Sequence, residues 1–173
     1  MTDVQPLIHK APAIKLNPQS KRCYFDVAIG SVCLSGEDTG GAYCLLELSM
    51  APGIGVPRHI HTREDESFYI LSGELQVMIR NEVLHLKPGD SLMAPRNIPH
   101  QLLNTGSSEN HYQILLSPSN FEKFLMGTAV PAPDKATPPT ERQLQMSHLQ
   151  LPLGMSLNSQ LIMELFSVEP GLD

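Results

Sequence analysis

Short runs of alternating or β-branched residues, separated by proline and glycine, fill the chain up to about residue 116. The 15 prolines and 12 glycines place turn signals too close together for long helices. Nine runs are predicted as strands, at residues 23–34, 42–50, 56–61, 66–71, 74–80, 82–86, 91–94, 100–104 and 111–116. Many short strands with turns between them predict an all-β fold, either a barrel or a sandwich.

Turn residues mark the ends of several of these runs. Residues 80–82 are predicted as the tip of a hairpin, because Asn81 tolerates a positive φ. Residues 87–90 carry proline followed by glycine, a combination that favours a tight turn. The glycines Gly53, Gly73 and Gly89 all fall at strand ends, where the backbone needs freedom and no side chain is required.

The pattern changes after Leu116. Residues 119–126 place Phe121, Phe124 and Leu125 on one side of a short predicted helix. Residues 130–139 hold four prolines and predict a stiff extended linker. Helices are predicted at residues 141–149, after a capping box, and at residues 158–166. The chain is therefore divided into a β-barrel region, residues 1–117, and a C-terminal helical extension, residues 118–173.

Composition narrows the choice of partners and compartment. A net charge of −6 without any basic cluster argues against a nucleic-acid partner. The apolar runs are too short to cross a membrane as a helix, and no secretory signal is visible. Cys23, Cys33 and Cys44 are an odd set without a paired motif, which indicates reduced thiols in a cytoplasmic protein. Apolar positions in the C-terminal extension need a surface to bury them, which predicts a homodimer.

Three histidines and one glutamate form the most informative pattern of the chain: His59, His61, Glu66 and His100. In a strand alternate side chains share a face, so His59 and His61 are expected to point the same way. Imidazole is a good ligand for zinc, copper, iron and nickel, and an added carboxylate suits iron and manganese. The four residues are therefore candidate ligands of one divalent metal ion, which could be Fe, Mn, Ni, Cu or Zn.

The segments around these residues resemble the two sequence motifs of the cupin superfamily. The first motif, G-x5-H-x-H-x3,4-E-x6-G, is matched at every defined position from Gly53 to Gly73. The second, G-x5-P-x-G-x2-H-x3-N, is matched from Gly89 to Asn104 except that Asn97 stands in place of the middle glycine. Asparagine tolerates positive φ better than other residues with a side chain, so the turn is expected to survive.

The resemblance implies a small jelly-roll β-barrel, with His59, His61, Glu66 and His100 as the metal ligands. A weaker likeness points to small bacterial cupins of the quercetinase-like kind. Asp65 occupies the other spacing that the motif permits and is the alternative carboxylate, whereas Glu64 is a candidate for a supporting or substrate-contacting group. Such a site differs from a closed, cysteine-rich structural zinc site, because it leaves coordination positions open for a substrate.

Three functions remain open for such a site. The leading hypothesis is an oxidoreductase of the dioxygenase type acting on a small organic, possibly aromatic, substrate, with Glu66 as a metal ligand that also accepts a proton from the substrate. Phe68 and Ile70 share the parity of Glu66 and are interpreted as core residues, with the wall of a substrate pocket as the alternative. His111 is a further candidate for a place at the barrel mouth. The alternatives are a sugar or keto-acid isomerase or lyase, in which the metal acts as a Lewis acid, and a non-catalytic binding module for small molecules.

Overall fold

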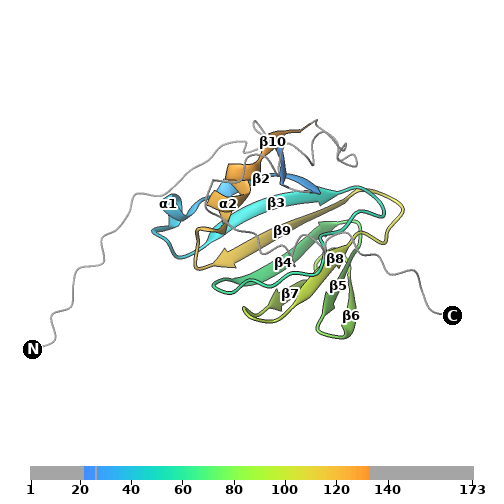
Figure 1. The fold of residues 1–173 in the computed structure, drawn as a ribbon. Helices are drawn as coiled ribbons and strands as arrows, with labels where there is room; N and C mark the ends of the chain where they lie inside the picture. The colour runs from blue at the N-terminus through green and yellow to red at the C-terminus, as the bar shows by residue number, and fades with distance from the viewer. Residues whose placement is uncertain (1–21, 26, 133–173) are drawn as a thin grey trace, which may run out of the picture.

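The computed structural model describes residues 22–25 and 27–132, which form two antiparallel sheets facing each other (Figure 1). The elements are β1 (Cys23–Phe25), β2 (Ala28–Leu34), α1 (Gly36–Thr39), β3 (Cys44–Met50), β4 (Asp65–Ser72), β5 (Leu75–Ile79), β6 (Glu82–Leu86), β7 (Ser91–Ala94), β8 (His100–Leu103), β9 (Asn110–Ser117), α2 (Phe121–Thr128) and β10 (Val130–Pro131). The larger sheet has the order β10-β1-β2-β3-β9-β4-β7, and the smaller has the order β6-β5-β8. This arrangement confirms the predicted all-β jelly-roll class.

Alternation along β9 sets which side chains enter the barrel. Tyr112, Ile114 and Leu116 are buried, whereas the residues between them are partly exposed. The core joins these to interior residues of β3, β4, β5 and other elements, namely Phe25, Ala28, Cys44, Leu46, Leu48, Met50, Phe68, Ile70, Leu75, Val77, Leu86, Ala94 and Leu102. Apolar side chains from both sheets therefore meet in one core, as the period-2 pattern of the sequence requires.

The predicted strands largely coincide with the observed ones, and residues 82–86 and 91–94 match without a shift. One prediction is wrong, because residues 56–61 form no regular strand. Only His59 makes a bridge, with His100, through two backbone hydrogen bonds of 2.9 and 3.0 Å. Further bonds join Leu102 N–H to Val56 C=O and Asn104 N–H to Ile54 C=O. The segment therefore runs extended beside β8 although it is not a regular strand.

Asn97 takes the conformation that the family motif reserves for glycine. Its φ is 63°, and its backbone N–H donates a 2.8 Å hydrogen bond to the His61 carbonyl. The turn therefore survives the departure from the motif, as predicted. The hairpin tip at residues 80–82 is different from the prediction, since Arg80, not Asn81, has the positive φ of 56°. The hairpin itself forms, with Ile79 paired to Glu82.

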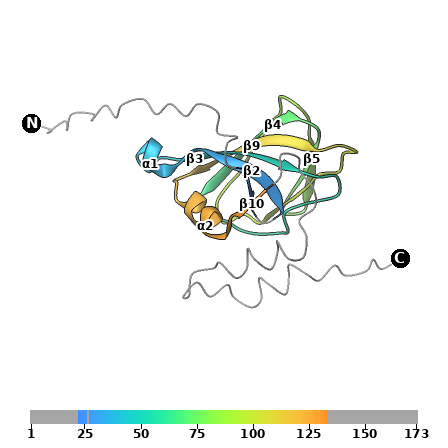
Figure 2. The same ribbon diagram turned by 90° about the horizontal axis from the view of Figure 1, so that it is seen from above.

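Two short helices lie near each other at one end of the barrel (Figures 1 and 2). Helix α2 confirms the predicted helix, displaced by two residues. The carboxylate of Glu122 in its first turn is buried and accepts 2.8 Å hydrogen bonds from the Gly36 and Asn120 backbone N–H groups. A side chain at Gly36 would collide with Ser119, so glycine permits this close approach. Glu122 thereby ties α2 to the start of α1.

The chain beyond α2 returns to the larger sheet. Val130 and Pro131 pair with Tyr24 and Cys23 of β1, so the first residues of the predicted linker form a strand. The rest of that linker and the helices predicted at residues 141–149 and 158–166 lie outside the described residues, and so do the apolar positions behind the homodimer prediction, which stays a prediction. Among the described residues no helix has the length and apolar character needed to cross a membrane.

Asn104, the last residue of the second motif, is fully buried and saturates its side chain with backbone partners. Its amide donates to the Met50 and Ser108 carbonyls, each at 2.9 Å, and its carbonyl oxygen accepts from Gly106 N–H at 3.0 Å. It therefore joins the end of β3 to the loop after β8.

We expect Asn104→Ala to lower the free energy of unfolding by about 3 kcal/mol, because several backbone groups lose their partner in a buried place. Chemical denaturation followed by circular dichroism measures the change. Thr105→Ala, at the exposed neighbouring position, is the matched control and should change stability by less than about 0.5 kcal/mol. Equal effects of the two substitutions would contradict the structural role of Asn104.

Candidate metal centre

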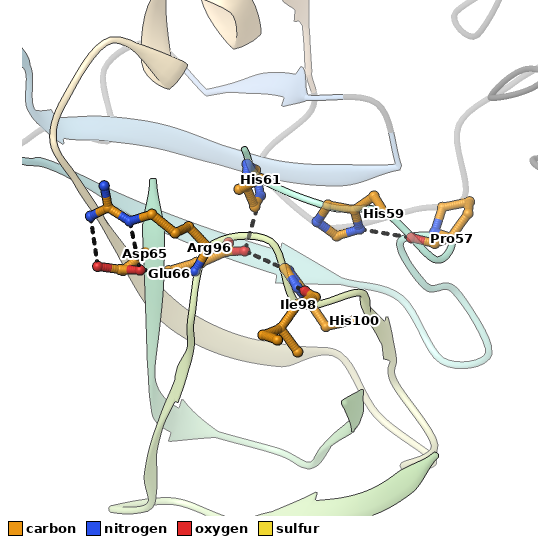
Figure 3. Close-up of polar contacts among 8 residues, drawn as sticks. All are labelled: Pro57, His59, His61, Asp65, Glu66, Arg96, Ile98 and His100. Carbon is orange, nitrogen blue, oxygen red and sulfur yellow. Dashed lines mark hydrogen bonds and ion pairs between the residues drawn. The ribbon is translucent and has the colours of Figure 1, made fainter. Parts of the chain in front are cut away.

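The structure brings His59, His61, Glu66 and His100 together into one cluster. One donor atom from each residue lies within 4.8 Å of the other three, and three of the four side chains are buried (Figure 3). His59 and His61 come from the extended segment before β4, Glu66 from β4 and His100 from β8. Ile60 between the two histidines is 50% exposed, so alternation does turn both imidazoles to the same side, as expected.

Backbone carbonyls orient two of the imidazoles. The Nδ1 of His59 lies 2.8 Å from the Pro57 carbonyl oxygen, and the Nδ1 of His100 lies 3.1 Å from that of Ile98 (Figure 3). A carbonyl can only accept, so Nδ1 carries the proton in both rings and Nε2 is directed into the cluster. Such outer contacts fix the ring orientation and tautomer of metal-binding histidines.

Glu66 carries the negative charge of the cluster in a buried position. Its Oε2 lies 2.9 Å from His100 Nε2 and 3.2 Å from His61 Nε2. Burial by itself would raise the pKa of Glu66, but hydrogen bonds from His100 and His61 outweigh it and bring the pKa to about 2. The carboxylate is therefore ionised throughout the physiological range.

The pKa values of His59 and His100 shift in opposite directions. Burial, together with the neighbouring His100, lowers the pKa of His59 to about 4, so His59 is neutral near pH 7 with a free Nε2 lone pair. Burial opposes protonation of His100 too, but its hydrogen bond to Glu66 and the charge of Glu66 raise its pKa. A proton shared between His100 and Glu66 thus compensates the buried carboxylate when no cation is bound.

The two neighbouring acids do not join the cluster. Asp65 points away and forms a two-pronged ion pair with Arg96, whose Nε and Nη2 lie 3.1 and 2.8 Å from its oxygens (Figure 3). The Arg96 side chain lowers the pKa of Asp65 to about 2. Glu64 is buried in the loop before β4 but is not among the clustered residues. The preference for Glu66 over Asp65 therefore agrees with the geometry.

An aromatic side chain that the sequence assigned only to a helix face contacts the cluster at His61. The Phe121 ring meets the His61 ring edge to face, with centroids 4.5 Å apart and planes at 87°. Phe124 follows at 5.6 Å from Phe121, and both rings are half-buried. The sequence showed the apolar side of this helix but held no sign of its partner, because the contact joins residues sixty positions apart.

The three residues predicted to line the substrate pocket occupy different places. Phe68 faces the interior beside the cluster, with its ring centroid 6.2 Å from that of His100, and Ile70 lies further along β4. Both are core residues with 1% exposure. His111 lies on the outer face of the larger sheet, where its Nε2 is 2.9 Å from Glu47 Oε1. The expectation that His111 reaches the barrel mouth is wrong, because it has the opposite parity to the interior residue Tyr112.

The donor set fits a divalent metal ion. Three imidazoles and an ionised carboxylate converge, the Nε2 of His59 already presents a lone pair, and the outer contacts fix ring orientation. A bound cation would balance the negative charge of Glu66 in place of the His100 proton. The described cysteines lie outside the cluster, so the site lacks the thiolates of a closed structural zinc centre.

We expect the protein to bind one divalent ion per chain, and His59→Ala to weaken binding by at least about 100-fold, since it removes a donor and not merely a supporting contact. Elemental analysis of untagged protein and titration calorimetry measure this. His85→Ala, which removes an exposed imidazole on β6, is the control and should leave affinity unchanged. Equal affinities of wild type and His59→Ala would exclude this site.

Metal affinity should rise with pH until pH exceeds the raised pKa of His100, which lies above the usual value of about 6.5. Below that pKa the metal must displace a proton, so affinity changes by about tenfold per pH unit. The His100–Glu66 pair stabilises the metal-free protein with the opposite pH dependence. This stabilisation is present at low pH and is lost as pH rises through that pKa. Calorimetry between pH 5.5 and 8.5, repeated in buffers of different ionisation enthalpy, measures the released protons; a flat affinity would refute the linkage.

Comparison with known proteins agrees with this geometry. The cupin domain family model matches residues 46–115, which include all four clustered residues. Quercetin 2,3-dioxygenase of Bacillus subtilis (strain 168) is 28% identical over 91 residues, covering 53% of this chain and 27% of that protein. The polyketide synthase CurC of Streptomyces cyaneus is 32% identical over 69 residues, covering 40% and 45%. The chain thus spans less than half the length of either relative.

Solved structures share the fold at low sequence identity. KdgF from Halomonas sp. has a TM-score of 0.58 and 18% identity, covering 65% of this chain and 99% of that one. A predicted oxalate decarboxylase from Thermotoga maritima has a TM-score of 0.56 and 20% identity, covering 61% and 99%. The motifs and the family match identify a cupin domain over residues 46–115, and the solved structures share its jelly-roll fold.

Proposed function

We propose that this cupin is a metal-dependent dioxygenase whose substrate is a small aromatic molecule with an acidic hydroxyl group, such as a flavonol or a catechol. The observation that carries the proposal is the four-donor cluster with an aromatic side chain, Phe121, in contact with one of its imidazoles. The similarity to a quercetin 2,3-dioxygenase over 91 residues supports the same class. A bound redox-active metal would supply the site for the oxidation chemistry.

The residues of the chain have separable roles in this proposal. His59, His61 and His100 hold the metal, and the Pro57 and Ile98 carbonyls keep two of these rings in place. Glu66 completes the donor set. In the metal-free cluster it is a weak proton acceptor, because hydrogen bonds from His100 and His61 hold its pKa near 2. Its proposed role as a general base therefore depends on a metal displacing these hydrogen bonds.

Phe121 is the element that favours an aromatic substrate. A planar ligand that lies over His61 would meet the Phe121 ring, and Phe124 extends the apolar surface along the same helix. Aromatic rings gain from stacked or edge-on contacts beyond simple burial. The wall proposed here therefore comes from α2, whereas Phe68 and Ile70 are buried core residues.

The charged groups near the cluster give less support to an isomerase or lyase acting on phosphosugars. Such substrates need cationic anchors directed at the cluster. Arg96 is already paired with Asp65, and Arg58 and Arg63, which flank the two histidines of the first motif, are exposed. A non-catalytic binding module would use the same donor set and would differ from an enzyme only in leaving its ligand unchanged. Ligand binding without oxygen consumption would favour that alternative, and activity with zinc alone would favour Lewis-acid chemistry.

We expect metal-loaded protein to consume oxygen with flavonols or catechols, and Phe121→Ala to raise KM about tenfold, the equivalent of about 1.4 kcal/mol, with a smaller change in kcat. An oxygen electrode measures both constants for protein loaded in turn with Fe, Mn, Ni, Cu and Zn. Phe121→Leu should recover part of the loss because it restores apolar contact, and Met126→Ala, at an exposed position of the same helix, should have no effect. Absence of metal-dependent oxygen uptake across the panel would sink the proposed function.

A further inference from the structure

Tyr112 carries a polar atom that the barrel itself does not satisfy. Its side chain is fully buried, and among the described residues its hydroxyl is the one buried side-chain N or O atom without a hydrogen-bond partner. Buried polar groups in folded proteins nearly always have a partner, and an unpaired one is destabilising. A phenylalanine would present the same ring without this cost, so the hydroxyl calls for an explanation.

The position of Tyr112 relates it to the metal centre. It lies on the interior face of β9, opposite Ile70 of β4 and Leu48 of β3. Glu66 enters the same interior from β4, where it pairs with Leu116 of β9. Burial raises the pKa of the hydroxyl, and the negative charge of Glu66 adds to this effect. The proton therefore stays on the oxygen, and Tyr112 is available as a hydrogen-bond donor.

Glu66 does not serve as the acceptor in the metal-free structure. Its Oε2 accepts from His61 and His100, and no hydrogen bond joins it to Tyr112. The surrounding core residues Phe68, Ile70 and Leu48 have no side-chain acceptor. The Tyr112 hydroxyl is thus a donor without a protein acceptor, in the same barrel interior as the cluster. A ligand bound at the cluster through an oxygen atom would supply the missing acceptor.

We propose that the Tyr112 hydroxyl donates a hydrogen bond to an oxygen atom of the ligand bound at the His59, His61, Glu66 and His100 cluster. The inference rests on the proposed function and makes it more specific, since it requires a ligand with an oxygen acceptor, such as a phenolate or enolate, directed into the barrel. Tyr112 would then select ligands by an oxygen inside the barrel, while Phe121 contacts the ring at the mouth.

Tyr112→Phe tests this with the zinc-loaded protein, which binds without turnover. The probes are 3-hydroxyflavone, which has the acidic hydroxyl, and flavone, which lacks it. We expect Tyr112→Phe to bind 3-hydroxyflavone about fivefold to tenfold more weakly than wild type. Fluorescence titration measures these dissociation constants. Flavone should show no such difference, and metal content should be the same in both proteins.

Thermal unfolding of the ligand-free, zinc-loaded proteins gives an independent readout. Because the hydroxyl has no partner there, Tyr112→Phe should melt at the same temperature as wild type or higher, and 3-hydroxyflavone should raise the melting temperature of wild type more. A ligand-free variant that is less stable, or that loses metal, would show that the hydroxyl already has a structural partner such as a buried water, and would overturn the inference.

The remaining outcomes separate this inference from the proposed function. If wild type and Tyr112→Phe bind 3-hydroxyflavone equally, the role of Tyr112 is refuted and the dioxygenase proposal stands. If wild type and Tyr112→Phe each bind flavone as tightly as 3-hydroxyflavone, the proposed selection of ligands by this oxygen is refuted in the same way. If zinc-loaded wild type binds neither probe nor catechol, the substrate class fails and the inference about Tyr112 fails with it.

Discussion

The buried carboxylate of Glu66 is the constraint around which the rest of the site is arranged. A negative charge away from water is tolerated only with close compensation, and His61 and His100 provide it through Oε2. The bridge between His59 and His100 brings the first motif to the second, and the Asn97 N–H bond to the His61 carbonyl fixes the turn beside it. The strands of the barrel thus deliver donors that none of them could assemble alone.

Much of this could be predicted because the determinants are local. The offset of two between His59 and His61 places both side chains on one face by alternation, and glycines mark the strand ends. The tolerance of Asn97 for positive φ followed from residue type, and its φ of 63° agrees. The irregular backbone at residues 56–61 did not follow, because hydrogen bonds to β8 override the regular strand that the pattern favours.

Contacts between distant segments account for what the sequence left open. The position of Phe121 over His61 depends on Glu122 binding Gly36, a contact across 86 positions that no periodicity reveals. His111 was misplaced because the sequence alone does not tell which face of β9 is interior; Tyr112 takes that face, and alternation turns His111 outward to Glu47. The unpaired hydroxyl of Tyr112 emerges only when every neighbour is in place.

Helix α2 has a consequence that reaches beyond this chain. The four clustered residues all lie within residues 46–115, the part that matches the cupin family, whereas Phe121 and Glu122 lie after it. The donor set and the surface that covers it are therefore encoded in separate stretches of sequence and joined by one carboxylate anchor. Substitutions in α2 can therefore alter the surface next to the cluster without changing any of its four residues.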